Sequence, residues 1–257
     1  MSNTELHETA AALVAEGKGI LAADESSGTI KKRFDSIGVE STEENRRAYR
    51  NLLFTTPGAE EYISGVILFD ETIRQSADDG TPFPELLASK GVIPGIKVDQ
   101  GAKPLAHADG ETVTEGLDGL RERLENYRGL GARFAKWRAT YSISDTLPSE
   151  YCIWTNAHAL ARYAALCQEA GIVFLSGGQS DEDATAHLNA MNAHGPHPWQ
   201  LSFSYGRALQ APALKAWGGK PENVEAGQQA YYHRAKMNAA ARTGTYAPEM
   251  EREAVGV

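Results

Sequence analysis

The stretch GKGILAADESS, residues 17–27, decides the fold class. Its apolar run from Ile20 to Ala23 follows a glycine and ends in Asp24, Glu25 and Ser26. A short apolar run of this kind is typical of a strand that is buried on both faces, as in a parallel sheet. No G-x-G-x-x-G fingerprint follows it, whereas an open, doubly wound sheet would normally carry one after its first strand. The stretch therefore favours a closed (β/α) barrel.

Five further segments repeat the pattern of an apolar run that ends in polar residues. They are SGVILFDET (64–72), VIPGIKVDQG (92–101), ARFAKWRAT (132–140), GIVFLSGGQS (171–180) and WQLSFSYGR (199–207). Helical patterns separate these runs, and strands that alternate with helices predict βαβ units and a parallel sheet. The sequence thus predicts an α/β fold: a TIM-type (β/α) barrel that is incomplete, with six of the usual eight βα units recognisable.

Several helix boundaries are readable as well. Ser41 followed by Glu44 forms a capping box at the start of TEENRRAYRNLL. Ser180 precedes the helical stretch DEDATAHLNAMNAH, with Asp183 three residues later. The Ala-rich stretch ENVEAGQQAYYHRAKMNAAARTG closes with a glycine. No linker or low-complexity segment divides the chain, so we expect a single barrel domain over residues 1–257 with disordered ends.

Composition and charge exclude several classes of protein. The net charge of −9 over 257 residues argues against a nucleic-acid partner. No apolar run approaches the ~18 residues that a membrane helix needs, and the first residues, MSNTELHETA, lack the apolar core of a signal peptide. Cys152 and Cys167 lie on one predicted helix, too far apart to pair locally, which indicates free thiols in a reducing compartment. We therefore expect a cytoplasmic protein without a membrane partner.

Polar side chains follow almost every predicted strand. In a barrel these strand ends converge on one mouth, where active sites lie. The residues are Asp24, Glu25, Ser26, Asp70, Glu71, Lys97, Asp99, Lys136, Arg138, Ser176, Gly177, Gly178, Ser204, Gly206 and Arg207. Carboxylates and lysines that gather at one site shift one another's pKa and supply acid and base groups. Cations together with free backbone N–H groups make a phosphate pocket.

Two of these strand ends predict the phosphate site most directly. In LSGGQS, Gly177 and Gly178 leave backbone N–H groups uncrowded, and Arg207 of SYGR brings a planar cation to the same place. The loops after the last two strands of a barrel are its usual phosphate site. Lys136 and Arg138 alternate with apolar residues, so both charges face the same side of their strand. An ordinary salt bridge at the strand end is the alternative for that pair.

The remaining polar motifs give weaker evidence for a functional site. Lys97 and Asp99 share the same alternate spacing, and a simple ion pair is the alternative to a functional role. His194 and His197 lie in the loop HGPH without a third ligand nearby, so we expect no metal site. The sequence contains neither a nucleophile elbow nor a Walker loop.

Long blocks of this sequence resemble class I fructose-bisphosphate aldolases. The blocks are GKGILAADESSGTIKKR, TEENRRAYR, GVILFDET, GIKVDQG, TEGLDGL, FAKWR, FLSGGQS and FSYGRALQAPALKAWGG, co-linear from about residue 5 to about residue 246. The resemblance implies a (β/α) barrel and the reversible, metal-independent cleavage of fructose 1,6-bisphosphate into dihydroxyacetone phosphate and glyceraldehyde 3-phosphate in glycolysis and gluconeogenesis. In that family a lysine forms a Schiff base with the ketose carbonyl, and the iminium is the electron sink for carbon–carbon cleavage.

The resemblance also implies roles for individual residues. Asp24 and Lys136 would be catalytic, orienting and polarising the substrate and assisting the proton transfers. The residues that would bind substrate and phosphate are Ser26, Lys97, Arg138, Ser176, Gly177, Gly178, Gly206 and Arg207. The family needs no cofactor and no metal. Its members tend to form tetramers, which leaves a homo-oligomer open for this chain.

One stretch departs from the family pattern. In the family, the strand that begins like residues 171–173 continues into a V-E-P-E segment with the acid–base glutamates. A strand with the Schiff-base lysine, in an L-L-K-P-N context, follows later. Here Val173 passes straight into Phe174, which corresponds to the family's seventh strand. Two whole βα units, roughly 85 residues, are therefore absent between these two positions.

This internal deletion has a chemical and a structural consequence. The covalent route requires an activated lysine. Lys136 or Lys97 could replace the absent one, but its own family role would then be vacant. The alternatives to an active aldolase are a non-catalytic relative that still binds sugar phosphates and a deletion product without function. Structurally, six strands either close more tightly than eight or leave a gap beside the strand at 171–176. A gap would expose sheet edge and apolar helix faces, so we expect a partial barrel or an aggregation-prone product.

Overall fold

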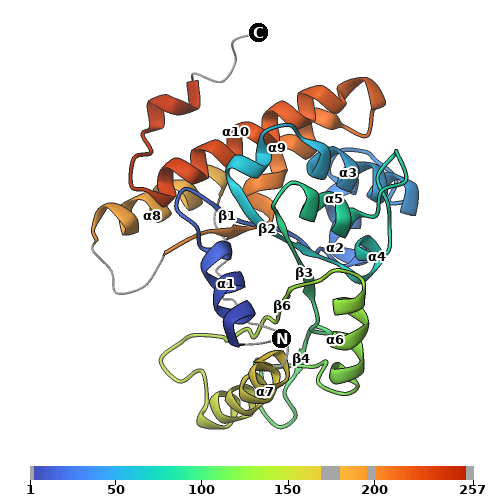
Figure 1. The fold of residues 1–257 in the computed structure, drawn as a ribbon. Coiled ribbons are helices and arrows are strands. Elements are labelled where there is room, and N and C mark those ends of the chain that lie inside the picture. The colour runs from blue at the N-terminus through green and yellow to red at the C-terminus, as the bar shows by residue number, and fades with distance from the viewer. Residues whose placement is uncertain (1–2, 169–179, 196–200, 253–257) are drawn as a thin grey trace.

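In the part of the chain that the structure describes, five parallel strands form the main sheet, and helices cover its outside (Figure 1). The computed structural model describes residues 3–168, 180–195 and 201–252. Within these residues the strand order is β6-β3-β2-β1-β7. The strands are β1 (Gly19–Ala23), β2 (Ile63–Leu68), β3 (Ile93–Lys97), β6 (Phe134–Lys136) and β7 (Ser204–Tyr205). Four of them lie inside apolar runs predicted to be strands, and β2 begins one residue before its predicted run at 64–72. All neighbouring pairs are parallel.

Ten α-helices and three short 3-10 helices complete the described part of the chain. The α-helices are α1 (Asn3–Leu13), α2 (Ser27–Asp35), α3 (Glu43–Thr55), α4 (Asp70–Ile73), α5 (Phe83–Ser89), α6 (Leu120–Gly129), α7 (Glu150–Gln168), α8 (Asp181–Ala193), α9 (Arg207–Trp217) and α10 (Val224–Arg242). The 3-10 helices are η1 (Ala59–Glu61), η2 (Pro221–Asn223) and η3 (Pro248–Arg252). Helix α10 packs against α9, α8 and α3. Its contact with α3 brings the C-terminal part of the chain against the N-terminal part.

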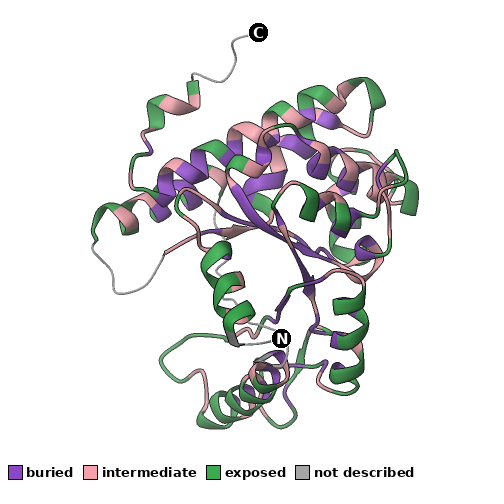
Figure 2. Ribbon diagram, in the orientation of Figure 1, coloured by how far each residue is buried: buried purple, intermediate pink, exposed green. Residues whose placement is uncertain are grey.

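The core lies on both faces of the sheet, as the apolar runs require. Every residue of β2 is buried, and Figure 2 shows burial along the central strands. Between the sheet and the outer helices, Tyr49 of α3 stacks on Trp217 of α9 with ring centroids 5.4 Å apart, and Phe34 of α2 packs against both. Inside the sheet, Phe134 occupies the space that a side chain at Gly95 would need. Large rings thus fill the places that strand glycines leave open.

The barrel is not closed in the described part of the chain. Among residues 3–168, 180–195 and 201–252, β6 and β7 are the two edges of the sheet, and each pairs with one strand only. This is the incomplete barrel that the sequence predicts. The run at 171–180, predicted to be a strand between these edges, lies outside the described residues except for Ser180.

Two of the three predicted helix boundaries are confirmed and one is wrong. Ser180 caps α8, since its Oγ accepts a hydrogen bond from the N–H of Asp183 at 3.2 Å. Gly244, with φ at 71°, follows the end of α10. The cap of α3, however, is Thr42 and not Ser41: Thr42 Oγ1 accepts from Asn45 N at 3.1 Å. Two consecutive hydroxyl residues fit the same capping pattern, and the backbone path into the helix selects the second.

The sequence pattern did not predict one small element. Strands β4 (Ala102–Pro104) and β5 (Thr112–Thr114) form an antiparallel pair outside the main sheet. All three residues of β4 are exposed, so β4 lacks the alternating apolar pattern by which a strand is predicted from sequence.

Candidate active site

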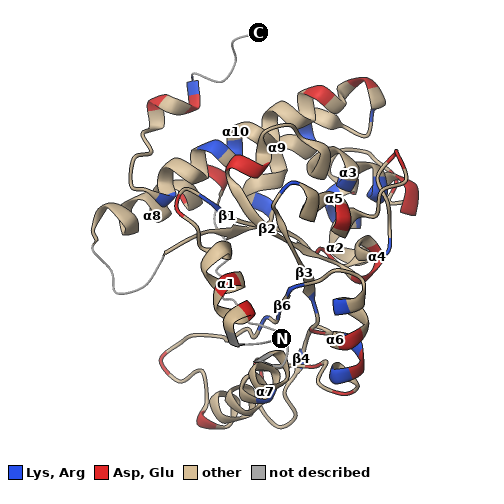
Figure 3. Ribbon diagram, viewed as in Figure 1, with Lys and Arg blue, Asp and Glu red and all other residues tan. Residues whose placement is uncertain are grey.

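A cleft of about 620 Å³ opens at the carboxyl ends of β1, β2 and β3, where polar residues were expected to converge. Nine of the residues singled out in the sequence lie in its wall: Asp24, Glu25, Ser26, Asp70, Lys97, Asp99, Lys136, Arg138 and Gly206. Figure 3 shows basic positions along β6 and at the end of β3. The cleft therefore combines carboxylates with several cations, as an anionic substrate requires.

Lys136 and Asp24 form a buried ion pair in the cleft. The Nζ atom of Lys136 lies 2.6 Å from Asp24 Oδ2, and each side chain is only 10% exposed. Lys136 is the last residue of β6, and Asp24 directly follows β1. An ammonium and a carboxylate in this geometry can donate and accept a proton at the same substrate atom.

A second ion pair lies beside the first. Lys97 is the register partner of Lys136 on the neighbouring strand. Its Nζ lies 2.9 Å from Asp99 Oδ1 and also donates to the Asp99 carbonyl oxygen at 2.6 Å. The ion pair that was the alternative interpretation of this spacing is therefore present, although Lys97 also lines the cleft. Among the described residues, Asp99 Oδ2 is buried without a hydrogen-bond partner.

The wall beside β1 is formed by the start of α2 and by a buried carboxylate. Ser26 is the N-cap residue of α2, and its Oγ lies 3.1 Å from Thr29 Oγ1 rather than on a backbone N–H. Glu25 is buried between Arg50 and Arg33. Burial alone would raise the pKa of Glu25, but the charges of Arg50 and Arg33 outweigh it and hold the pKa below its ordinary value.

The predicted phosphate residues are only partly brought together. Gly206 lies in the cleft wall, with the carbonyl oxygen of Ala22 close to its backbone. Arg138 is exposed at the rim of the same cleft. Arg207, the first residue of α9, is exposed, and among the described residues it is not part of the cleft lining; its charge acts on Asp181 instead. Residues Ser176, Gly177 and Gly178 lie outside the described residues.

Sequence reasoning missed several side chains that line the cleft. Arg33 and Thr29 come from α2, and Arg123 and Tyr127 come from α6. Arg33 follows Ser26 by two helical turns, so helical periodicity could have placed it on the same side of α2. Arg123 carries no such signal, because it lies 25 residues after Val98, the residue at the strand end that it contacts. It donates to the Val98 carbonyl oxygen at 2.9 Å.

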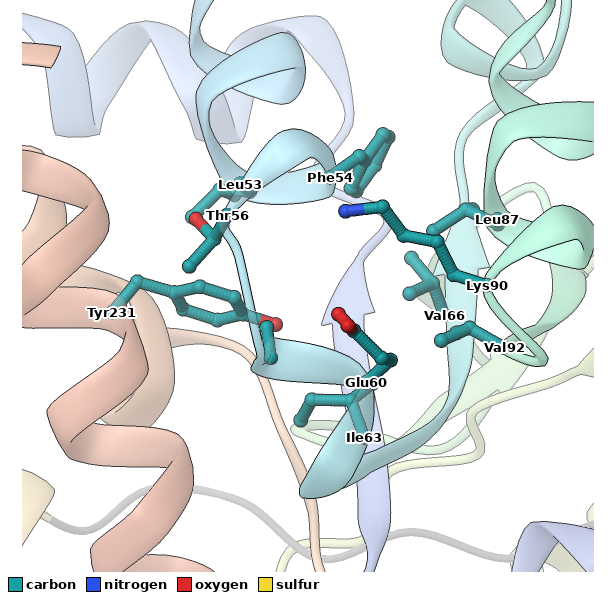
Figure 4. A pocket seen from close by; sticks show the side chains of 11 residues that line it. Leu53, Phe54, Thr56, Glu60, Ile63, Val66, Leu87, Lys90, Val92 and Tyr231 are labelled. Carbon is teal, nitrogen blue, oxygen red and sulfur yellow. The ribbon is translucent and has the colours of Figure 1, made fainter. Parts of the chain in front are cut away.

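A second cavity lies at the opposite ends of the strands, and its size separates it from the cleft. It measures about 20 Å³ and is lined by residues near the amino ends of β2 and β3, with Glu60, Lys90 and Tyr231 among them (Figure 4). A single water needs about 10–15 Å³, so this cavity has room for water and not for a metabolite. The cleft, unlike this cavity, is large enough for a metabolite and is lined by the polar residues at the strand ends.

Among the described residues, no group of three or more His, Cys, Asp or Glu side chains lies close enough together to hold a metal ion. No described helix is long and apolar enough to cross a membrane.

Comparison with known proteins identifies the family. The family model for fructose-bisphosphate aldolase class-I matches residues 5–173 and residues 169–256. These two matches together span nearly the whole chain. The chain belongs to this family. A probable fructose-bisphosphate aldolase class 1 of Xylella fastidiosa strain Temecula1 is 48% identical over 332 aligned positions, which cover 96% of this chain and 99% of the relative.

Aldolases from eukaryotes are similar as well. The cytosolic fructose-bisphosphate aldolase 6 of Arabidopsis thaliana is 44% identical, and the match covers 94% of this chain and 91% of the relative. The solved structure of fructose-bisphosphate aldolase from Plasmodium falciparum, in complex with TRAP and a small-molecule inhibitor, superposes with a TM-score of 0.91 at 39% identity over 95% of each chain. The aldolase fold of this chain is therefore established by an independent structure.

The same comparisons agree with an internal deletion in this aldolase. The family model matches in two pieces that meet at residues 169–173, next to the predicted junction of Val173 and Phe174. The alignment with the Xylella relative has 332 positions, and 257 residues cannot fill them, so at least 75 positions, the difference, have no counterpart here. The absent stretch is long enough for the two βα units that the sequence pattern lacks.

Proposed function

We propose that this chain acts on fructose 1,6-bisphosphate as a class-I-type aldolase, a metal-independent lyase of the cytoplasm, and that the cleft at the strand ends binds the substrate. The observation that supports this proposal most directly is the buried Lys136–Asp24 pair, at 2.6 Å, in the wall of that cleft. The family membership gives the reaction, and the pair offers the proton-transfer groups that the reaction needs.

The charges of the cleft suit a substrate with two phosphate groups. Lys97 and Arg138 lie on the side of β3 and β6, whereas Arg33 lies on the side of β1. A substrate that spans the cleft meets cations at both ends and the Lys136–Asp24 pair between them. Lys136 would donate to a substrate oxygen, and Asp24 would take up the proton of a hydroxyl group.

The covalent step is where this chain differs from its relatives. Class I chemistry needs an amine that attacks the ketose carbonyl, and the resemblance assigns the family's lysine to the absent stretch. Lys136 and Lys97 are the lysines that line the described cleft, and each is paired with a carboxylate. An amine that must leave an ion pair before it attacks reacts slowly, so we expect turnover that is orders of magnitude below that of a complete aldolase.

Reductive trapping tests the proposal. The purified chain is incubated with dihydroxyacetone phosphate and sodium borohydride, and its intact mass is measured. We expect an adduct of one triose phosphate per chain, mapped to Lys136 or Lys97 by peptide analysis and lost in the matching Lys→Met variant. Lys31, which pairs with Asp35 on the exposed surface of α2, provides the control variant Lys31→Met.

The opposite result is equally informative. A folded chain that gives no adduct and no aldol cleavage in a coupled assay contradicts the enzymatic proposal. If fructose 1,6-bisphosphate nevertheless raises the melting temperature of that chain, the cleft binds the sugar phosphate without chemistry. If neither adduct nor stabilisation is seen, the chain is a deletion product without this function.

A further inference from the structure

Glu25 is a buried charge beside the Lys136–Asp24 pair, and its carboxylate contacts several side chains. It directly follows Asp24, and its side chain is 5% exposed. Its two carboxylate oxygens accept from three side chains of three different helices: Arg33 of α2, Arg50 of α3 and Gln210 of α9. A buried carboxylate with this many partners is held in one position.

Two of the three partners hold Glu25 from behind, away from the cleft. Arg50 Nη2 lies 2.5 Å from Glu25 Oε2, and Arg50 Nη1 donates to Gln210 Oε1 at 3.1 Å. Gln210 Nε2 donates both to Glu25 Oε1 at 2.9 Å and to the carbonyl oxygen of Ala22 in β1 at 2.7 Å. Arg50 and Gln210 are 3% and 1% exposed. This closed network fixes the carboxylate relative to the strand that carries Asp24.

The third partner faces the cleft. Arg33 Nη1 lies 2.5 Å from Glu25 Oε1, and the Arg33 side chain is 24% exposed and lines the cleft. One carboxylate between two guanidinium groups leaves one positive charge in excess. Because Arg50 is buried, that excess charge is presented by Arg33. A guanidinium bound on one edge keeps its other N–H groups available to an anion.

We infer that Glu25 is a positioning residue that acts through Arg33: fixed by Arg50 and Gln210, it holds the Arg33 guanidinium against the cleft wall so that its outward N–H groups bind a phosphate of the ligand. This inference rests on the proposed function, since it assumes that the cleft binds a sugar phosphate. It adds Glu25, Arg50 and Gln210 to the residues that determine affinity, although none of them needs to touch the ligand.

A purely structural role for Glu25 makes a different prediction. In that case its loss lowers stability and weakens binding independently of Arg33, so the effects of the two changes multiply. A positioning role makes them redundant, because Glu25 has nothing left to position once the Arg33 guanidinium is gone. A double-mutant cycle separates the two.

The experiment measures the binding of fructose 1,6-bisphosphate by calorimetry to the unaltered chain, Glu25→Gln, Arg33→Gln and the double variant. We expect Arg33→Gln to weaken binding about tenfold or more, as the loss of a charge-assisted hydrogen bond does, with Glu25→Gln somewhat less. The double variant should bind no more weakly than Arg33→Gln. Glu251→Gln, which removes a carboxylate–arginine pair with Arg234 outside the cleft lining, should bind as the unaltered chain does.

Folding is controlled in two ways. The melting temperature of each ligand-free variant shows whether it is folded. Gln210→Leu loosens Glu25 without removing a charge, so it should also weaken binding, in a chain that keeps both arginines. Unchanged binding in Glu25→Gln, or losses that multiply in the double variant, overturn the inference while the proposed function stands. An unaltered chain that binds neither fructose 1,6-bisphosphate nor inorganic phosphate overturns both.

Discussion

Lys136 Nζ lies 2.6 Å from Asp24 Oδ2, although two other strands separate β6 from β1 in the sheet order. In a flat sheet three strand spacings of about 4.8 Å would place these strands roughly 14 Å apart. Two side chains can meet across that distance only if the sheet curves strongly around the cleft. The ion pair therefore shows that the sheet keeps the curvature of a barrel although two βα units are absent.

Removal of one member of this pair should destabilise the protein. Lys136→Met leaves the Asp24 carboxylate buried without its cation, and breaking a buried pair costs about 3 kcal/mol. Urea unfolding followed by circular dichroism measures the loss. The double variant Lys136→Met with Asp24→Asn should recover much of it, because no charge is then left unpaired. A single variant within about 0.5 kcal/mol of the unaltered chain would contradict the pair's burial.

Stability should fall at acidic pH in a way that depends on Glu25. The charges of Arg50 and Arg33 hold its pKa below 4.5 in the folded state, although burial opposes them. A carboxyl group whose pKa is lowered by folding adds stability that is complete above its unfolded-state pKa and is lost as pH falls through the folded-state pKa. The free energy of unfolding should therefore drop below about pH 4.5, with a shallower slope in Glu25→Gln.

A surface carboxylate provides the control for this pH series. Asp35 pairs with Lys31 on the exposed side of α2, with half of its side chain accessible. Exposed pairs contribute little to stability. Asp35→Asn should keep the acid slope of the unaltered chain, and an equal flattening in both variants would show that Glu25 has no special part in it.

The two cysteines should be unreactive in the folded protein. Cys152 and Cys167 are both buried on α7, without a disulfide. Burial raises the pKa of the Cys167 thiol to about 12 and also raises that of Cys152. Since the thiolate is the reactive species, labelling by a disulfide reagent near pH 8 should be slow in buffer and reach two thiols per chain in denaturant. Rapid labelling of the folded chain would show that α7 opens easily.

The exposed side of α7 should promote self-association. Tyr151 and Trp154, one helical turn apart, are 51% and 62% exposed, and Ile153 between them is 44% exposed. Apolar patches of this kind are typical of surfaces that another polypeptide covers. Sedimentation velocity should show concentration-dependent association that Trp154→Glu reduces. Ala157→Glu, on the same helix and also exposed, tests whether any added charge has this effect. A strictly monomeric unaltered chain would contradict the expectation.

Local sequence patterns determined much of this protein. The apolar runs predicted all five strands of the described sheet, because a strand buried on both faces must be apolar along its own length. The cap at Ser180 and the glycine after α10 could be predicted because both depend on hydrogen bonds within a few residues. The break between Val173 and Phe174 was visible because the family's motifs are co-linear on either side of it.

Only the tertiary structure decided which polar groups meet. Asp24 and Lys136 are 112 residues apart, and their contact depends on the curvature of the whole sheet. Arg33 reaches the cleft while Arg207 lies outside its described wall, although both are arginines on helices that follow strand ends. Burial, partner choice and the direction of a side chain depend on packing between distant segments. The sequence determined which residues stand at the strand ends, and packing decided which of them form the site.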